Sequence, residues 1–214
     1  MKKKVKVYWG RIAIFVLSVV GTIALIALIL SLLFPEKPAE PDPAPSYVKK
    51  SFLKSNPYSR PGDPLKKVNN IVIHYVANPG TSAEANRNYF NNLANSASNP
   101  DGVKASAHFI VGLSGEVIQC IPLSEIAYAN APRNGDTVSI EVCHPDETGK
   151  FAPETEDALV RLTADLLNEY GLTSSDVIRH YDVSGKACPK YYVENEEAWK
   201  SLLQKIQALQ EETE

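Results

Sequence analysis

The sequence predicts an α/β fold, a single domain with a central mixed β-sheet flanked by helices, preceded by one N-terminal transmembrane helix. Three observations support this prediction. Apolar, β-branched runs of strand length alternate with longer segments of helical periodicity. Residues 12–34 carry no charged side chain, and the proline-rich residues 35–46 separate this run from the rest of the chain.

The apolar run 12–34 (IAIFVLSVVGTIALIALILSLLF) is long enough to span a membrane. At ~1.5 Å per residue it forms roughly 35 Å of helix, against a hydrocarbon core about 30 Å thick. A cleaved signal peptide is the alternative, but its apolar region is about 7–15 residues long and ends at a small-residue cleavage site. Here residues 35–38 (PEKP) follow directly. We therefore expect an uncleaved, single-pass membrane anchor.

The flanking segments indicate how this anchor is oriented. Residues 1–11 carry five of the 22 Lys and Arg and no acidic side chain, which predicts a cytoplasmic basic tail and an extracytoplasmic domain. Residues 35–46 (PEKPAEPDPAPS) are a semi-extended spacer. The folded domain is then 47–214, with a core of about 69–210. The formal net charge of -3 arises despite the basic tail, so the domain is acidic, which argues against nucleic acid as a partner.

The first half of the domain contains four predicted strands and one helix. Residues 69–77 (NNIVIHYVA) form a continuous apolar run, typical of a central strand that is buried on both faces. A helix capped at Thr81-Ser82 follows. Residues 107–113 and 116–121 are expected to pair as a hairpin through Ser114-Gly115, and residues 137–144 (TVSIEVCH) form another strand.

The second half is dominated by two helices. Glu154 to Tyr170 places its leucines on one face, and Gly171 ends this helix. A short apolar segment, Val177-Ile178, precedes a polar stretch. The last helix, about 194–210, carries a second apolar stripe.

Two polar residues are unusual for the strands that contain them. His74 interrupts an apolar strand, and Glu141 lies on the face opposite Ile140 and Val142. A satisfied core histidine and an exposed strand face are the ordinary interpretations. A buried, unpaired carboxylate is costly, however, so on a central strand Glu141 needs a cation, a metal or a water-filled site.

The segment 179–190 (RHYDVSGKACPK) offers three alternatives. Cys188 could be a nucleophile with His180 as its base, both residues could be metal ligands, or the segment could be only a loop. The polar setting of Cys188, beside Lys186, favours its thiolate. Cys120 and Cys143 lie in apolar strand patterns, where cysteine behaves as a small buried hydrophobe.

These separate residues are explained together if they share a pocket. The histidines His74 and His180 and the thiolate of Cys188 make a His₂Cys set that leaves a fourth tetrahedral position open, which is the layout of a catalytic zinc site. The eight-residue step from His180 to Cys188 does not match a zinc-finger spacing, so spacing alone is weak evidence.

Four segments resemble a known family. They are IVIHYVA (71–77), SAHFIVGLSGEVIQCIP (106–122), SIEVCH (139–144) and RHYDVSGKACP (179–189). In this order they resemble the zinc-dependent N-acetylmuramoyl-L-alanine amidases of the type 2 class, which share a fold with phage T7 lysozyme and the peptidoglycan recognition proteins.

The resemblance implies a mechanism. It implies that His74, His180 and Cys188 bind one Zn²⁺ per chain, that Glu141 is the catalytic acid/base, and that Lys186 stabilises the oxyanion. The implied substrate is the peptidoglycan of the bacterial cell wall, cleaved at the amide between N-acetylmuramic acid and L-alanine. The anchor would then lie in a bacterial membrane, and no protein partner is predicted.

The chain also departs from the family pattern. Tyr128-Ala129-Asn130 stands where many members carry Trp-His-Ala, and Ala107 stands where some have tyrosine, so the acid/base role falls more heavily on Glu141. Substrate contacts are expected from four residues: Tyr75, His108, Tyr128 and Asn130. His144 receives no role, and Asp182 is expected to cap a loop.

Two other functions compete with the amidase. A non-catalytic peptidoglycan-binding sensor would be expected to lack the cysteine ligand, which this chain retains as Cys188. A cysteine peptidase that uses Cys188 and His180 leaves His74 and Glu141 unexplained.

Overall fold

The computed structural model describes residues 15–23, 25–26, 42–95 and 97–213. The chain divides into two units, Met1–Pro41 and Asp42–Glu214. In the first unit the described residues are helical. The predicted tail 1–11, much of the predicted span 12–34 and most of the predicted spacer lie outside the described residues. Within the described part of the chain, no helix is both long enough and apolar enough to cross a membrane.

The second unit is built on one six-stranded sheet with the strand order β1-β4-β3-β5-β2-β6. Neighbouring strands are parallel except β3 and β4, which form the predicted antiparallel hairpin. The predicted mixed sheet is therefore confirmed. In sequence order the strands are Lys49–Lys50 (β1), Asn70–Tyr75 (β2), Phe109–Val111 (β3), Val117–Gln119 (β4), Thr137–Val142 (β5) and Val177–Arg179 (β6).

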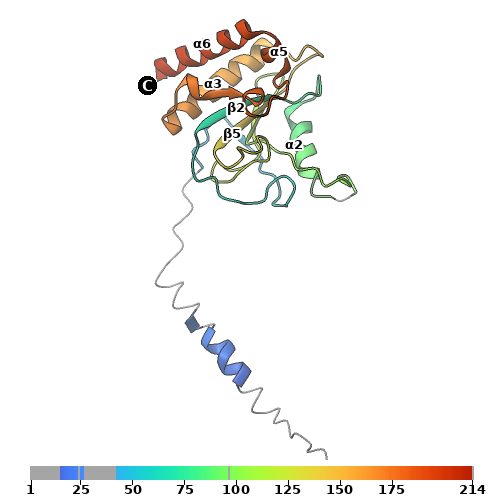
Figure 1. Ribbon diagram of the computed structural model, residues 1–214, viewed down its shortest axis with the longest axis vertical. Helices are drawn as coiled ribbons and strands as arrows, with labels where there is room; N and C mark the ends of the chain where they lie inside the picture. Colours follow the sequence, from blue (N-terminus) through green and yellow to red (C-terminus); the bar gives the residue numbers. More distant parts are fainter. Residues whose placement is uncertain (1–14, 24, 27–41, 96, 214) are drawn as a thin grey trace, which may run out of the picture. The chain divides into compact units, whose positions relative to one another are not determined.

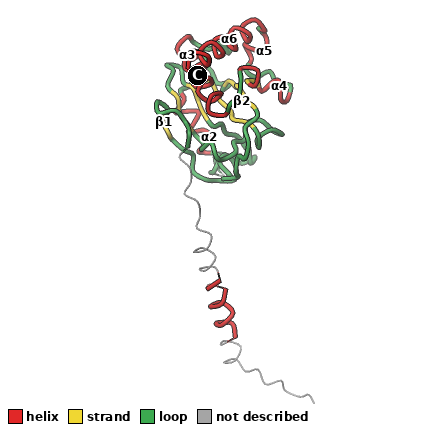
Figure 2. Tube along the Cα trace, turned by 90° about the vertical axis from the view of Figure 1, so that its left-hand side faces the viewer, coloured by secondary structure: helices red, strands yellow, loops and turns green. Residues whose placement is uncertain are grey.

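Helices cover both faces of this sheet. The long helices α3 (Pro153–Tyr170) and α6 (Glu196–Thr213) pack side by side on one face, while α2 (Ala83–Asn92) lies on the other (Figure 1). Figure 2 shows the same helical layer from the side, together with the short elements near it. Two of these short elements are α4 (His180–Ser184) and α5 (Lys190–Glu194), and the 3-10 helix η1 (Ser174–Asp176) precedes β6 in the chain.

Strand alternation divides the core into two apolar clusters. Ile73 of β2 and Ile140 of β5 point to the α3/α6 side and belong to one cluster with Leu162 and Trp199. The α2 side is a smaller cluster that includes Phe90. Because successive strand residues point to opposite faces, His74 and Glu141 belong to the α2 side. This thinner side leaves room for a pocket.

The helix boundaries follow their predicted signals. The Ser82 side chain accepts a hydrogen bond from the Ala85 N–H (3.2 Å) at the start of α2. Gly171 ends α3 in the left-handed conformation (φ 61°), and its N–H bonds back to the last turn.

The sequence prediction missed several short elements, among them β1, η1, α4 and α5. β1 pairs with β4, and α4 and α5 lie on either side of Cys188. The suggestion that residues 179–190 are only a loop is therefore wrong, since His180–Ser184 is a helical turn. None of these pieces is long enough to show a hydrophobic period.

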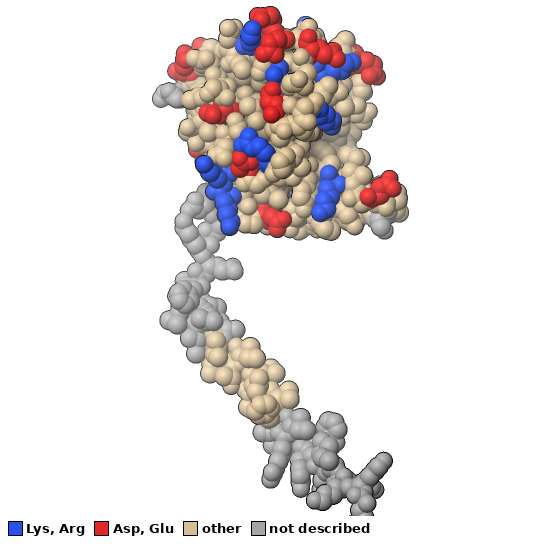
Figure 3. All heavy atoms as spheres, in the orientation of Figure 1, with Lys and Arg blue, Asp and Glu red and all other residues tan. Residues whose placement is uncertain are grey.

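Acidic and basic side chains are interspersed on the surface. On the face drawn in Figure 3, Lys and Arg lie close to Asp and Glu in the second unit. Ion pairs among the described residues include Arg60–Glu125 (2.6 Å) and Arg179–Glu196 (2.9 Å). The described charges therefore tend to be paired locally.

Candidate metal centre and active site

The register of two parallel strands places the first two site residues side by side. His74 of β2 pairs with Glu141 of β5. Both lie near the carboxyl ends of their strands, the edge where parallel α/β sheets usually carry their sites. His74 Nδ1 is 4.0 Å from Glu141 Oε1. Two residues that are far apart in the sequence are thus direct neighbours.

A helical turn supplies the remaining residues. β6 lies beside β2 and leads directly into α4, whose first residue is His180. Gly185 ends α4 with φ 76°, a left-handed conformation that glycine adopts without strain. The chain then turns back, and the Tyr181 N–H donates to the Cys188 carbonyl (2.9 Å). This reversal brings Cys188 against His180 despite the seven residues between them.

The three residues form a cluster that could hold a metal ion. The ligand atoms of His74, His180 and Cys188 lie within 4.8 Å of one another. Cys188 Sγ is 3.7 Å from His74 Nδ1, and the two imidazole rings are 4.6 Å apart. His180 Nδ1 is buried without a hydrogen-bond partner, as expected of a nitrogen that coordinates a metal. Two imidazoles and one sulfur suit zinc.

A chain of hydrogen bonds fixes the protonation of His74. The Thr137 hydroxyl donates to the Arg133 carbonyl (2.7 Å) and accepts from Asn130 Nδ2 (2.8 Å). The Asn130 amide oxygen therefore faces His74 Nε2, at 2.6 Å, and requires a proton there. Nδ1 is left as the lone-pair nitrogen on the side of Cys188. This is the support that metal-binding histidines commonly receive.

Burial keeps both histidines neutral. It lowers the pKa of His74 to about 3, with a further contribution from the charge of His180. It also lowers the pKa of His180, and the Lys186 ammonium acts in the same direction. Neutral imidazole is the form that binds a metal.

The expectation that Cys188 favours its thiolate is wrong for the metal-free chain. The residue is only 2% exposed, and burial raises the pKa of its thiol to about 12. The nearby Lys186 lowers this pKa by less than burial raises it. A bound metal deprotonates a coordinating thiol outright, whereas a cysteine nucleophile would need a low pKa without one. The setting therefore suits a ligand.

Glu141 has the environment of an acid/base. Burial raises the pKa of its carboxyl to about 8, and the Lys186 ammonium partly opposes this shift. Its Oε2 is buried without a hydrogen-bond partner. A carboxyl group that titrates near neutrality can both take up and release a proton.

A pocket of about 200 Å³ opens onto the cluster. Beyond the three ligand residues and Glu141 it is lined by Tyr75, Phe90, Lys104, Ala105, Ser106, Tyr128, Ala129 and Lys186. The structure therefore brings Tyr75, Tyr128 and Lys186 to the site. Their contacts with substrate remain predictions.

Two other expected substrate contacts lie behind the pocket. Asn130 is 1% exposed and bonds to His74. His108 is fully buried, with its Nε2 at 3.0 Å from the Glu125 carbonyl and its Nδ1 at 3.1 Å from the Ser139 N–H. Neither lines the pocket, so their positions favour a supporting role.

Asp182 has the capping role that the sequence suggested. Its carboxylate accepts the Arg179 N–H (2.8 Å) at the start of α4 and pairs with the Arg179 guanidinium (2.9 Å). Arg179 also bonds to Glu196 of α6 and to the Tyr192 carbonyl. Nothing in the sequence pattern points to the roles of Arg179, Thr137 and Lys104, because their contacts depend on how loops and turns fold against one another.

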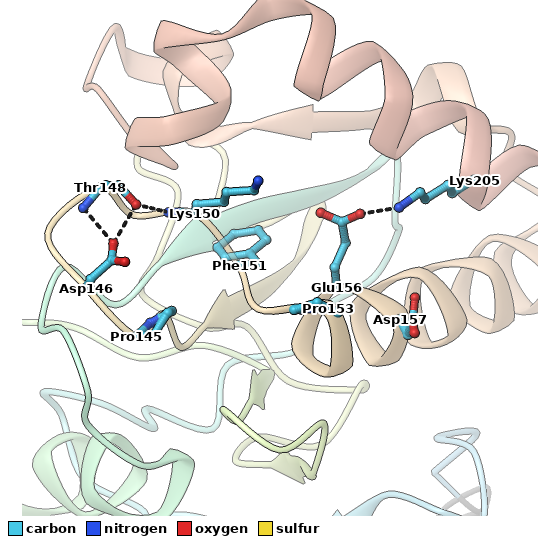
Figure 4. A pocket seen from close by; sticks show the side chains of 9 residues that line it. All are labelled: Pro145, Asp146, Thr148, Lys150, Phe151, Pro153, Glu156, Asp157 and Lys205. Atoms are coloured by element: carbon cyan, nitrogen blue, oxygen red, sulfur yellow. Dashed lines mark hydrogen bonds and ion pairs between the residues drawn. The ribbon is translucent and has the colours of Figure 1, made fainter.

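A larger pocket of about 560 Å³ lies elsewhere, between the loop after β5 and helices α3 and α6 (Figure 4). Figure 4 shows the ion pair between Glu156 and Lys205 across it and the turn formed by Asp146 and Thr148. Its lining contains neither histidine nor cysteine and shares no residue with the metal-cluster pocket. The smaller pocket is the one equipped for chemistry.

Comparisons with known proteins agree with this geometry. The N-acetylmuramoyl-L-alanine amidase family matches residues 64–191, which contain every ligand and acid/base candidate. The N-acetylmuramoyl-L-alanine amidase CwlL of Bacillus licheniformis is 34% identical over 174 residues, covering 76% of this chain and 47% of the relative. BlyA of Bacillus subtilis is 32% identical over 179 residues, covering 74% and 46%. The chain spans about half the length of these curated relatives.

Solved structures are similar over the same region. A mutant endolysin from Bacillus subtilis superposes with a TM-score of 0.61 at 27% identity, covering 74% of this chain and 97% of that one. The catalytic domain of XlyA gives a TM-score of 0.60 at 26% identity, covering 74% and 98%. With a family match over more than half of its residues, this chain belongs to the type 2 N-acetylmuramoyl-L-alanine amidase family.

Proposed function

We propose that this chain is a zinc-dependent peptidoglycan hydrolase that cleaves the amide between N-acetylmuramic acid and L-alanine of the stem peptide. The observation that carries the proposal is the cluster of His74, His180 and Cys188 with Glu141 beside it. Family membership supplies the bond, since the relatives are named for it. The ligand set and the acid/base are the residues that the sequence predicted.

Three residues would hold the metal, and neighbouring residues would set the protonation of these ligands. Zinc bound by His74, His180 and Cys188 would supply a Lewis acid that polarises the scissile carbonyl and lowers the pKa of a water molecule. Asn130 keeps the proton of His74 on Nε2, so that Nδ1 is available as a ligand. Cys188 would bind the metal as its thiolate, giving up the thiol proton.

Glu141 would move the protons. Its carboxylate takes a proton from the attacking water and returns it to the departing nitrogen, the double role of a general acid/base. Lys186 lines the same pocket and is near enough to influence the pKa of Glu141. Its ammonium would stabilise the negative charge that develops on the carbonyl oxygen.

The product of the reaction tests this proposal. The full-length chain is incubated with purified peptidoglycan, with and without a chelator, and new chain ends are identified by mass spectrometry. We expect free N-terminal L-alanine, lost on chelation and restored by zinc. Cleavage that resists the chelator but stops on thiol alkylation would indicate a cysteine peptidase. Binding without cleavage by the zinc-loaded chain would indicate a sensor.

We further propose that residues 12–34 anchor the chain in the bacterial membrane, with residues 1–11 cytoplasmic and the amidase domain, 47–214, on the outside. The support is the uncharged apolar run and the basic segment before it. The spacer 35–46 would hold the domain away from the lipid, on the side where peptidoglycan lies.

Fractionation of bacterial cells that express the full-length chain tests this location. We expect the chain to stay with membranes through an alkaline carbonate wash, and protease added to spheroplasts to digest the domain. Recovery of the chain in the soluble fraction, or protection of the domain from external protease, would contradict the proposal.

A further inference from the structure

Lys104 lies where two pockets meet. The pocket at the metal cluster, of about 200 Å³, and a neighbouring pocket of about 390 Å³ share Lys104, Tyr128, Ala129 and His180 in their linings. The second pocket continues to Asn134, and Lys186 lines only the first. Together they form a groove that runs from the reaction centre past Lys104.

The Lys104 ammonium is held beside an aromatic ring, and no carboxylate of a described residue pairs with it. Its Nζ lies 5.2 Å from the centre of the Tyr128 ring, within the range of a cation–π contact. The backbone beneath is fixed, because Ser106 N–H donates to the Tyr128 carbonyl (3.0 Å) and Tyr128 N–H donates to Ser106 Oγ (2.9 Å). Lys104 makes no ion pair with any described residue. Its charge is therefore available to a ligand.

The charge of this groove restricts the substrate. Among the described residues that line the two pockets, Glu141 is the only acidic one, and it belongs to the reaction centre. The carboxyl group of the muramoyl unit forms part of the scissile amide and therefore carries no charge. Any remaining carboxylate of the substrate must therefore belong to the peptide.

We propose that Lys104 binds a free carboxylate of the peptide part of the substrate. The peptide then runs from the metal cluster past Lys104 and Tyr128 toward Asn134, and the saccharide occupies the opposite side of the cluster. This inference rests on the function proposed above and adds a direction and a charge requirement to it. Lys104 is a specificity residue and takes no part in bond cleavage.

The test compares two N-acetylmuramoyl tripeptides of one sequence, with the peptide carboxylates free in one and amidated in the other. Lys104→Gln in the full-length chain should raise KM for the acid form about five- to tenfold, with kcat unchanged, because one charge-assisted hydrogen bond is lost. It should leave KM for the amide unchanged. Lys104→Arg should retain the preference for the acid, and Lys104→Glu should reverse it. Lys66→Gln, at an exposed lysine away from both pockets, is the matched control.

A binding measurement separates this inference from the proposed function. Calorimetry with the two tripeptides is repeated in a Glu141→Gln background, where turnover should be at least about 100-fold slower. Tighter binding of the acid form that Lys104→Gln abolishes supports the inference, even if the parent chain cleaves neither compound and the proposed function fails. Equal affinity for the two forms, or a preference that survives Lys104→Gln, would overturn it.

Discussion

At the scale of single residues, the metal centre depends on which nitrogen of His74 is available. The bond from Nε2 to Asn130 settles this, because Thr137 and the Arg133 carbonyl orient the amide of Asn130. Asn130 thus acts through His74 from a buried position. The sequence assigned it to substrate binding, since only its place before the glutamate strand was visible there.

Replacing Asn130 by alanine should weaken zinc binding about 10- to 100-fold, because His74 loses the acceptor that fixes its tautomer. Competition with a chromophoric chelator gives the affinity. Asn130→Asp should retain most of it, since a carboxylate oxygen can still accept from Nε2 and the Thr137 hydroxyl can turn to donate to it. Equal affinity for Asn130→Ala and the parent chain would show that the bond is not needed.

Replacing Glu141 by glutamine should lower kcat by at least about 100-fold, because an amide of the same size cannot carry the proton. Zinc content should remain that of the parent chain, since Glu141 is not one of the three clustered ligands. Glu147→Gln, at an exposed position, should keep full activity. Full turnover by the Glu141 variant would exclude its acid/base role.

At the scale of elements, the short helix α4 decides the geometry of the site. It places His180 at its start, and the reversal after Gly185 returns Cys188 to the same point. The Arg179 side chain connects this turn to α5 and α6 through Tyr192 and Glu196. A turn of five residues is too short to be stable alone, so these tertiary bonds must hold it.

The end of α3 permits a clean test of element stability. Gly171 is left-handed, and a Cβ added there would meet no atom within 4 Å, so Gly171→Ala changes only backbone strain. We expect it to lower the free energy of unfolding by about 1 kcal/mol, measured by urea denaturation. Gly135 also has open space but an ordinary φ, so Gly135→Ala should be neutral or slightly stabilising. Equal losses for the two variants would refute this account.

The long elements could be predicted from sequence because each carries its own signal. The strand at 69–77 and the helix ending at Gly171 show periodicity and caps within a few residues, and the structure has them. β1, α4 and α5 carry no such signal, because packing against distant segments stabilises them. The positions of these three elements become apparent only in the folded structure.

Some residues of the candidate site could likewise be predicted from the sequence, and others could not. His74 and Glu141 were visible because a polar residue in a buried strand demands an explanation. Burial of Cys188 was not visible, because a polar local sequence gave no indication that the turn folds back against the sheet. Lys104 and the role of Asn130 were missed because both depend on neighbours brought together by the fold.

At the scale of the whole molecule, the sheet is a rigid platform whose parallel strands end at one edge. β2, β5 and β6 deliver His74, Glu141 and His180 to that edge. Apolar packing under α3 and α6 holds the strands from behind. The chemistry is thereby separated from the main apolar core.

The stability of this platform should depend on pH through His108. Its Nε2–H donates to the Glu125 carbonyl and its Nδ1 accepts from the Ser139 N–H, so the buried ring has no place for a second proton. Burial accordingly lowers its pKa to about 4, against 6.5 when unfolded. Below pH 6.5 His108 is protonated in the unfolded chain but stays neutral in the folded chain. The free energy of unfolding therefore falls as the pH drops toward 4.

This pKa shift should lower the free energy of unfolding by about 3 kcal/mol between pH 7 and pH 4. Urea unfolding of the chelator-treated chain at several pH values should show a steeper loss for the parent than for His108→Gln, which has no such group. Parallel pH profiles for the two proteins would show that His108 does not contribute.

X-ray absorption at the zinc edge tests the central claim most directly. The full-length chain, purified without added chelator, should bind one zinc with a single sulfur neighbour at about 2.3 Å and nitrogen neighbours at about 2.0–2.1 Å. Cys188→Ser should remove the sulfur signal, and Cys120→Ser should leave it unchanged, because Cys120 is buried in the core away from the cluster. A chain that binds no zinc, or a sulfur signal that persists in Cys188→Ser, would contradict the metal centre described here.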